Sequence, residues 1–187
     1  MFETLDEVLS YHCAPTLLRL KPASLVSLSW REFPNLEAQV AAYDRHFRGR
    51  GIRFRLLCTC RRNALLLVWQ EALLARQLAQ PLTQRLLRRD GYRPEDGAAA
   101  MLDRLSVRLR RMEDFPHEVG LFLGYPPEDV EGFQRCRGRN CKLCGYWKVY
   151  SDVDRARALF RQYDRCREVL YPRVVRGATL SQIFRAA

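Results

Sequence analysis

One stretch of the chain constrains its fold more than any other: an alternating segment that is followed at once by an apolar one. Over residues 52–61, apolar side chains such as Ile52, Phe54 and Leu56 alternate with residues that are mostly basic or polar. This two-residue period is typical of a β-strand with one buried face. Residues 64–69 are all apolar, as in a strand that is buried on both faces. Because the intervening Arg-Arg-Asn sequence suits a turn, we predict a hairpin over about residues 52–69.

The rest of the chain predicts helices around this hairpin. Apolar residues recur at helical spacing in segments at about 4–20, 35–47, 71–89, 98–112, 151–170 and 180–184, with a shorter one from Pro127. Pro15 and Pro81 are expected to break the first and third of these helices. Short apolar stretches near 24–30, 118–123 and 145–150 predict further strands. We therefore expect an α+β fold, a single domain over residues 1–187 whose small, mainly antiparallel sheet is packed by helices.

The length and the cysteine count narrow the class of protein. A chain of 187 residues can bury a core without disulfides or an obligatory metal. No apolar run approaches the roughly 18 residues of a membrane helix, and the acidic start MFETLDEVLS lacks the apolar core of a secretory signal. Seven cysteines, an odd number, then indicate free thiols in a reducing compartment. We expect a cytoplasmic protein without a membrane partner.

The net charge of +11 raises nucleic acid as a partner. All but three of the 32 basic residues are arginines, and they are spread along the chain, which weakens that inference. The densest cluster includes the candidate anion-binding residues Arg53, Arg55, Arg61 and Arg62. A solvated basic face is the favoured interpretation, and nucleic-acid binding is the alternative.

The strongest local signal is Cys141-x-x-Cys144-Gly145. Two cysteines at this spacing can point both sulfurs at one ion, and the glycine lets the turn close, as in rubredoxin-like and zinc-knuckle turns. No second such pair exists, but Cys136 extends the pattern to the order of plant-type ferredoxins, with Cys166 as a conceivable fourth ligand. The candidate cofactors are iron, zinc or an iron–sulfur cluster. A reactive or redox thiol pair and purely structural thiols are the alternatives.

Two histidine-containing pairs are further candidates. His12 and Cys13, next to Pro15, could supply metal ligands from the first helix or form a partly buried pair at its bend. His117 and Glu118 could act as an acid/base pair, or the histidine could simply be hydrogen-bonded near the surface. The spacing of a metalloprotease motif is absent.

For the remaining candidates, packing is the favoured interpretation. Cys58 and Cys60 share the apolar face of the predicted first hairpin strand and are expected to be small buried hydrophobes. Tyr125, Tyr146 and Trp147 lie close in sequence to several arginines and could form a stacking platform of the kind that single-strand binders use.

Four strings of residues resemble a known family. YHCAPTL, FPHEVGLFLGYPPEDVEGF, NCKLCGYWKVYSD and YDRCRE are similar to those of a numbered bacterial family of unknown function that is common in anaerobic Firmicutes. Its genes are often found beside flavodoxin and ferrous-iron transport genes. The resemblance therefore implies iron or redox metabolism, and an acidic redox protein such as flavodoxin as the partner of this basic chain.

The resemblance covers nearly the whole chain and carries over to individual positions. Cys136 falls outside the family pattern, which speaks against a ferredoxin-type cluster. The positions inside the shared strings are His12, Cys13, His117, Glu118, Gly120, Gly124, Tyr125, Pro126, Cys141, Cys144, Gly145, Tyr146, Trp147 and Cys166.

Three hypotheses follow. The first is a binding or accessory protein of iron or redox metabolism that holds a metal or redox cofactor through the Cys-x-x-Cys-Gly turn, with Cys13 and His12 as further ligands. The second is an enzyme on a small molecule, in which His117 and Glu118 transfer protons, and it requires a concave pocket at His117. The third is a basic nucleic-acid-binding protein whose affinity falls steeply with salt.

Overall fold

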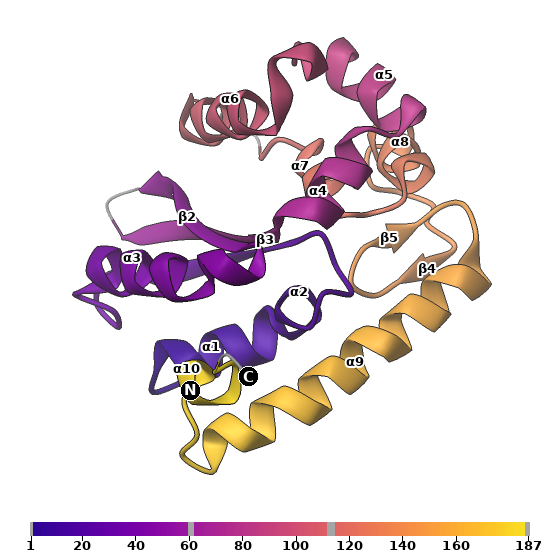
Figure 1. Cartoon of the computed structure of the whole chain (residues 1–187). Coiled ribbons are helices and arrows are strands. Elements are labelled where there is room, and N and C mark those ends of the chain that lie inside the picture. The colour runs from indigo at the N-terminus through magenta and orange to yellow at the C-terminus, as the bar shows by residue number, and fades with distance from the viewer. Residues whose placement is uncertain (1, 60–61, 112–114, 186–187) are drawn as a thin grey trace.

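The predicted hairpin forms the centre of the molecule. A computed structural model describes residues 2–59, 62–111 and 115–185. In it, β2 (Ile52–Thr59) and β3 (Asn63–Gln70) are antiparallel, and β1 (Ala23–Ser29) pairs with the other edge of β3. The order β1-β3-β2 makes β3 the middle strand, with helices above and below it (Figure 1). This position explains why β3 is apolar at successive residues: it presents side chains to two cores.

The first core lies between one face of the sheet and the terminal helices. Val68 and Phe54 point into it from the sheet. The helices that cover this face are α1 (Leu5–His12), α2 (Ala14–Leu17), α3 (Leu36–Phe47), the second half of α9 (Val153–Val175) and α10 (Leu180–Ile183). A short 3-10 turn, η1 (Arg48–Arg50), connects α3 to β2. Figure 1 shows α9 running the length of the molecule, with both chain termini near its far end.

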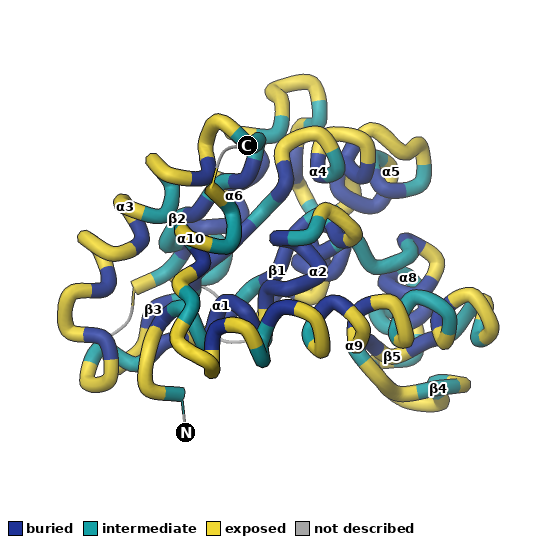
Figure 2. Tube along the Cα trace, turned by 60° about the horizontal axis from the view of Figure 1, so that its bottom comes forward, coloured by how far each residue is buried: buried dark blue, intermediate teal, exposed yellow. Residues whose placement is uncertain are grey.

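The second core lies on the opposite face. Leu67 of β3 and Leu57 of β2 point into it. Its cover consists of α4 (Glu71–Leu78), α5 (Pro81–Arg89), α6 (Gly97–Arg111), α7 (Val119–Phe122) and α8 (Pro127–Cys136). A 3-10 turn, η2 (Pro94–Asp96), lies between α5 and α6. Figure 2 shows buried residues gathered towards the inside of the molecule, with exposed residues on the outer turns of helices such as α5. The α+β class and the breaks at the two prolines are confirmed.

The third cluster is a small hairpin on the first half of α9. β4 (Leu143–Cys144) pairs antiparallel with β5 (Lys148–Val149) and forms a separate two-stranded sheet. Trp147 and Val149 pack there against Ala156 and Tyr163 of α9. The predicted strand at 145–150 is therefore shorter than expected and does not join the main sheet.

Two local predictions are wrong. The apolar segment 118–123 forms the helical turn α7 rather than a strand, because the amides of Val119 and Gly120 turn back to the carbonyls of Pro116 and His117, at 3.2 Å each. A buried run this short carries no readable period.

The other error is the side on which Cys58 lies. A β-bulge shifts the β2 register between Leu56 and Cys58, so the Cys58 thiol faces α6 and donates to the carbonyl of Leu109 at 3.8 Å, on the second core's side. Cys60 lies outside the described residues.

The helices of the described ranges include none that is both long and apolar enough to cross a bilayer. The longest, α9, begins at the N-cap Asp152, whose carboxylate accepts the amide of Arg155 at 3.0 Å.

Candidate functional site

The central candidate site is built by residues 116–126, which two glycines fold back on themselves. The chain leaves α7 at Gly124, whose φ of +78° favours glycine. A Cβ there would lie 2.4 Å from Cδ of Pro22. At Gly120, a Cβ would lie 2.9 Å from Cδ2 of Tyr125. The two glycines therefore allow Pro22 and the Tyr125 ring to pack directly against this turn.

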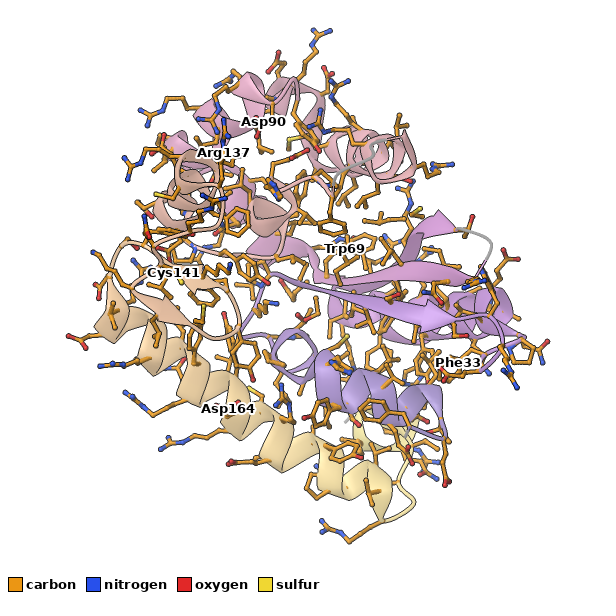
Figure 3. The ribbon with its side chains drawn as sticks, turned by 180° about the vertical axis from the view of Figure 1, so that it is seen from behind. Phe33, Trp69, Asp90, Arg137, Cys141 and Asp164 are labelled. Atoms are coloured by element: carbon orange, nitrogen blue, oxygen red, sulfur yellow. The ribbon has the colours of Figure 1, made fainter. Side chains whose placement is uncertain are left out.

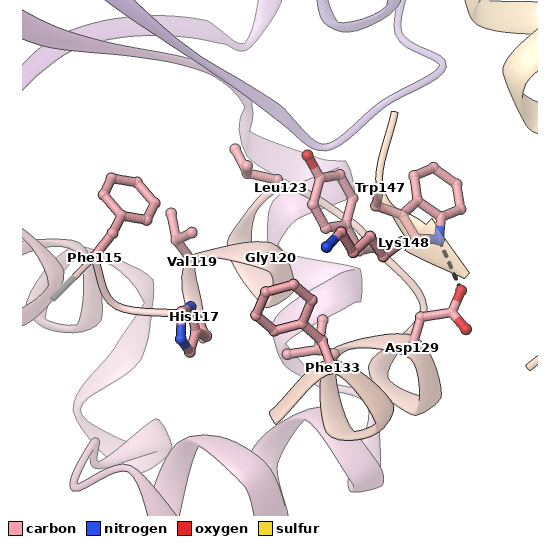
Figure 4. Close-up of a pocket in the computed structure, with 11 residues that line it drawn as sticks. Phe115, His117, Val119, Gly120, Leu123, Asp129, Phe133, Trp147 and Lys148 are labelled. Carbon is pink, nitrogen blue, oxygen red and sulfur yellow. Dashed lines mark hydrogen bonds between the residues drawn. The ribbon is translucent and has the colours of Figure 1, made fainter. Parts of the chain in front are cut away.

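A cavity of about 310 Å³ opens beside the turn (Figure 4). Its lining is mainly apolar and comes from α7, α8, the residues before α7 and the β4–β5 hairpin. Four aromatic rings contribute to it, those of Phe115, Tyr125, Phe133 and Trp147. Tyr125 and Trp147 are stacked, with ring centroids 5.1 Å apart. The stacked pair gives the cavity one flat aromatic wall.

The orientation of Trp147 is fixed by Asp129. Its indole N–H donates to one carboxylate oxygen of Asp129 at 2.7 Å, and the amides of Tyr150 and Ser151 both donate to the other, also at 2.7 Å. Asp129 itself is buried. Because three protein donors already hold its two oxygens, this carboxylate supports the wall.

Two basic side chains, His117 and Lys148, also line the cavity. The His117 ring stands edge-on to Phe133, with centroids 4.8 Å apart, and the Lys148 ammonium lies 5.8 Å from the same ring. Lys148 also donates to the carbonyl of Gly138 at 2.8 Å. In the described part of the chain neither forms an ion pair. Figure 4 shows them on either side of Phe133, so basic donors lie on two sides of this ring.

Glu118 does not belong to this cavity. It is buried on the other side of the turn. There its carboxylate accepts hydrogen bonds from Nε of Arg108 and from the hydroxyl of Tyr92, the latter at 3.0 Å. His117, its neighbour in sequence, is exposed and lines the cavity. The structure therefore separates the predicted acid/base pair, and Glu118 is engaged in a buried ion pair.

A lysine that the sequence did not single out is buried behind Tyr125. Lys21 is only 7% exposed, and its ammonium lies 5.4 Å from the Tyr125 ring. Burial lowers the pKa of Lys21 to about 8. The nearby Cys13 thiol is fully buried, which raises its pKa to about 12. Within the described ranges no carboxylate pairs with Lys21. The one feature of the sequence that distinguishes Lys21 is that the chain contains only three lysines.

The two cysteines of the Cys-x-x-Cys-Gly turn lie together at the β4–β5 hairpin. The Sγ atoms of Cys141 and Cys144 are 3.2 Å apart, and Cys144 is exposed. The hydrogen bond between them raises the pKa of Cys141. Gly145 is required because a Cβ would lie 2.2 Å from the Phe160 ring of α9. Figure 3 shows Cys141 at this end of the molecule, near the start of α9.

The other predicted metal ligands do not converge on this pair. Cys13 is buried in the first core, whereas His12 is exposed beside the rings of Phe2 and Tyr11. Cys166 also packs in the first core. Among the described residues, no three histidines, cysteines or acids are grouped so that they could hold a metal ion.

Two of the four candidate anion-binding arginines form ion pairs with acidic side chains. Arg53 pairs with Asp44 at 2.8 Å and with Glu71 at 3.2 Å, and Arg55 pairs with Asp103. Burial alone would raise the pKa of Asp44, but hydrogen bonds from Arg53, Arg48 and an amide outweigh it and hold the value at about 2. Arg62 is exposed, and Arg61 lies outside the described residues.

Of the three predicted lining aromatics, two line the cavity. Tyr146 instead faces α9: its hydroxyl donates to Asp164 at 2.8 Å and accepts from Arg167 at 3.1 Å. Phe133 and Lys148 were missed. Phe133 follows the predicted helix start at Pro127, and Lys148 alternates with Trp147 on the predicted strand, but neither position shows that the two side chains meet.

Comparison with known proteins identifies the chain by family only. The model of a family described as "Protein of unknown function (DUF3793)" matches residues 9–184. Neither the curated proteins nor the solved structures gave a match.

Proposed function

The chain belongs to the DUF3793 family, and from its own geometry we propose that it binds a small aromatic or apolar anion in the cavity beside His117. One observation carries this proposal: a mainly apolar cavity holds two basic side chains that have no acidic partner among the described residues. The hypothesis of a small-molecule enzyme required a concave pocket at His117. We propose that this pocket binds a ligand rather than catalyses a reaction.

The size of the cavity limits the ligand. A volume of about 310 Å³ is at the lower end of the roughly 300–1,000 Å³ typical of ligand pockets. The flat wall of Tyr125 and Trp147 favours a planar ring, because aromatic rings stack at offset. A ligand of one or two fused rings fits both features.

The basic side chains of the cavity favour an anionic ligand. Lys148 brings an ammonium to the lining, and a carboxylate or phosphate would accept a charge-assisted hydrogen bond from it. His117 adds a second donor on the other side of Phe133. The one carboxylate of the described lining, Asp129, already accepts three hydrogen bonds from the protein. A cationic ligand would therefore compete with these three donors for the only acid of the described lining.

Binding is favoured over proton transfer because Glu118 is absent from the cavity. Among the described residues, no carboxylate is hydrogen-bonded to His117 to orient it, as happens in acid/base pairs. Metal binding at Cys141 and Cys144 stays a prediction that needs at least two ligands from elsewhere. A flavodoxin-like partner, nucleic-acid binding and a cytoplasmic location also stay predictions.

The test uses three probes of one shape and different charge: 2-naphthoate, 2-naphthamide and 2-naphthylmethylamine. Isothermal titration calorimetry on the full chain should show saturable one-site binding of the anion, weaker binding of the amide and weakest binding of the amine. No saturable binding of any probe, or a preference for the amine, contradicts the proposal.

A matched pair of lysine variants locates the site. Lys148→Met removes the ammonium but keeps an unbranched apolar side chain, and it should weaken 2-naphthoate binding about fivefold, equivalent to about 1 kcal/mol, while binding of the amide is unchanged. Lys142→Met, on the same hairpin, removes a lysine that donates to the carbonyl of Ser151 and does not line the cavity. Equal losses in both variants would show that the effect is not local to the cavity.

A further inference from the structure

The described cysteines differ in what surrounds their sulfur atoms. Cys13 and Cys166 are buried in the first core, and Cys58 donates to a main-chain carbonyl. Only Cys141 and Cys144, among the described residues, bring two sulfurs together, at 3.2 Å. This separation is about 1.2 Å longer than a disulfide bond of roughly 2.05 Å.

The hairpin holds this pair in place from both sides. The amide of Lys142, between the two cysteines, donates to the carbonyl of Val149 at 2.8 Å, and the amide of Gly145 donates to the carbonyl of Trp147 at 3.1 Å. Cys144 lies opposite Lys148 in the strand register. The short turn therefore presents both sulfurs at the surface, and closing a bond between them needs only a small movement.

We propose that Cys141 and Cys144 form a reversible disulfide and make this turn a thiol–disulfide exchange site for small disulfides. The geometry favours this reaction over metal ligation because two thiols complete a disulfide, whereas a tetrahedral metal site needs four ligands. The site is independent of the cavity proposal, since it needs no bound ligand.

The exchange takes place in two balanced steps. The thiolate of Cys144, the more exposed of the two, attacks one sulfur of the small disulfide, forms a mixed disulfide and releases the first small thiol. The thiolate of Cys141 then attacks Sγ of Cys144, forms the internal bond and releases the second small thiol. The protein gives up two electrons and two protons, and the small disulfide is reduced to two thiols.

The experiment equilibrates the reduced full chain with defined ratios of reduced and oxidised glutathione, followed by acid quenching, alkylation and mass spectrometry. Two thiols should be lost together. Trypsin cleaves after Arg139, Lys142 and Lys148, so the disulfide should join peptides 140–142 and 143–148. Glutathione that accumulates on the wild-type chain without this link would overturn the proposal, as would stoichiometric metal that blocks alkylation of both thiols.

Two variants and an unfolded control sharpen the result. Cys136→Ser removes a neighbouring thiol at the end of α8 and should behave as wild type, whereas Cys141→Ser should trap the mixed disulfide on Cys144. In the folded chain, half-oxidation should occur at an about tenfold more reducing glutathione ratio than in urea, because the fold holds the sulfurs together. Equal ratios in both states would show that the fold does not promote the bond and would refute the site.

Discussion

Replacing the buried Lys21 by methionine should stabilise the protein at neutral pH and leave its stability almost unchanged at high pH. The ammonium of Lys21 is 7% exposed and has the Tyr125 ring, the buried Cys13 thiol and no carboxylate around it within the described ranges. Methionine fills nearly the same volume without a charge, so the substitution removes the cost of burying one.

The magnitude follows from the pKa of Lys21. Its fall from the ordinary 10.5 to about 8 on burial corresponds to about 3 kcal/mol of lost stability below pH 8, at 1.36 kcal/mol for each pH unit. Between pH 8 and 10.5 the unfolded chain binds this proton and the folded chain does not, so wild-type stability rises with pH across that interval. We expect Lys21→Met to gain about 1–3 kcal/mol at pH 7 and to lose this advantage by about pH 10.5.

Urea unfolding of the wild type and of Lys21→Met at pH 7, 8.5 and 10, in the presence of reductant, measures the difference in their free energies of unfolding. Other thiols and phenols titrate in both unfolded chains, so their contributions cancel in the comparison. Burial keeps the pKa of Cys13 near 12, so this thiol stays neutral in the folded state over this range, and burial also raises the pKa of Tyr125. Lys142→Met, at an exposed site, is the control and should change stability by less than about 0.5 kcal/mol.

A variant that is less stable than wild type at pH 7, with a difference that does not change with pH, would refute the reasoning. That result would mean that the ammonium of Lys21 is stabilised in the folded state by more than the Tyr125 ring. A stabilisation of equal size at all three pH values would show instead that methionine packs better, with no contribution from the charge.

Two further substitutions test how the cavity wall is built. Asp129 accepts hydrogen bonds from three donors, the indole N–H of Trp147 and two main-chain amides, and Asp129→Asn leaves only one acceptor oxygen for them. Urea unfolding should therefore show a free energy of unfolding about 2–4 kcal/mol lower than that of the wild type. Gly132→Ala places a Cβ 2.6 Å from Cβ of Tyr150 and should cost more than 1 kcal/mol. In contrast, Gly49→Ala has no heavy atom within 4 Å of the new Cβ and should be neutral within about 0.5 kcal/mol by the same assay.

The elements that could be predicted from the sequence are those with a long enough period. The hairpin at 52–69 and helices such as α3 and α6 repeat their pattern over eight or more residues, and their boundaries agree with the prediction within a few residues. The α7 turn has only four residues, and in so short a buried run a strand and a helix look alike. The bulge after Leu56 also leaves no mark in the apolar pattern, because it depends on pairing with β3.

The candidate site was predictable in part. Tyr125, Trp147 and His117 were singled out by their unusual sequence context and they do line one cavity. Glu118 was paired with His117 only because the two are adjacent, and successive residues at the start of a helical turn point in different directions. The same argument applies to His12 and Cys13 at the end of the first helix: His12 is exposed, whereas Cys13 is buried in the first core.

Lysine is rare in this chain, and the structure gives a physical reason to look at where it remains. An arginine is always charged, whereas a lysine can give up its proton when it is desolvated. Lys21 is the position where that difference matters most, since the fold buries it behind Tyr125 without an acid among its described neighbours. Lys148 lines the cavity to which Tyr125 also contributes. A sequence can show that these lysines are exceptional among 32 basic residues. Their proximity to one aromatic site depends on contacts between the residues before β1, the turn after α7 and the β4–β5 hairpin, which no local pattern encodes.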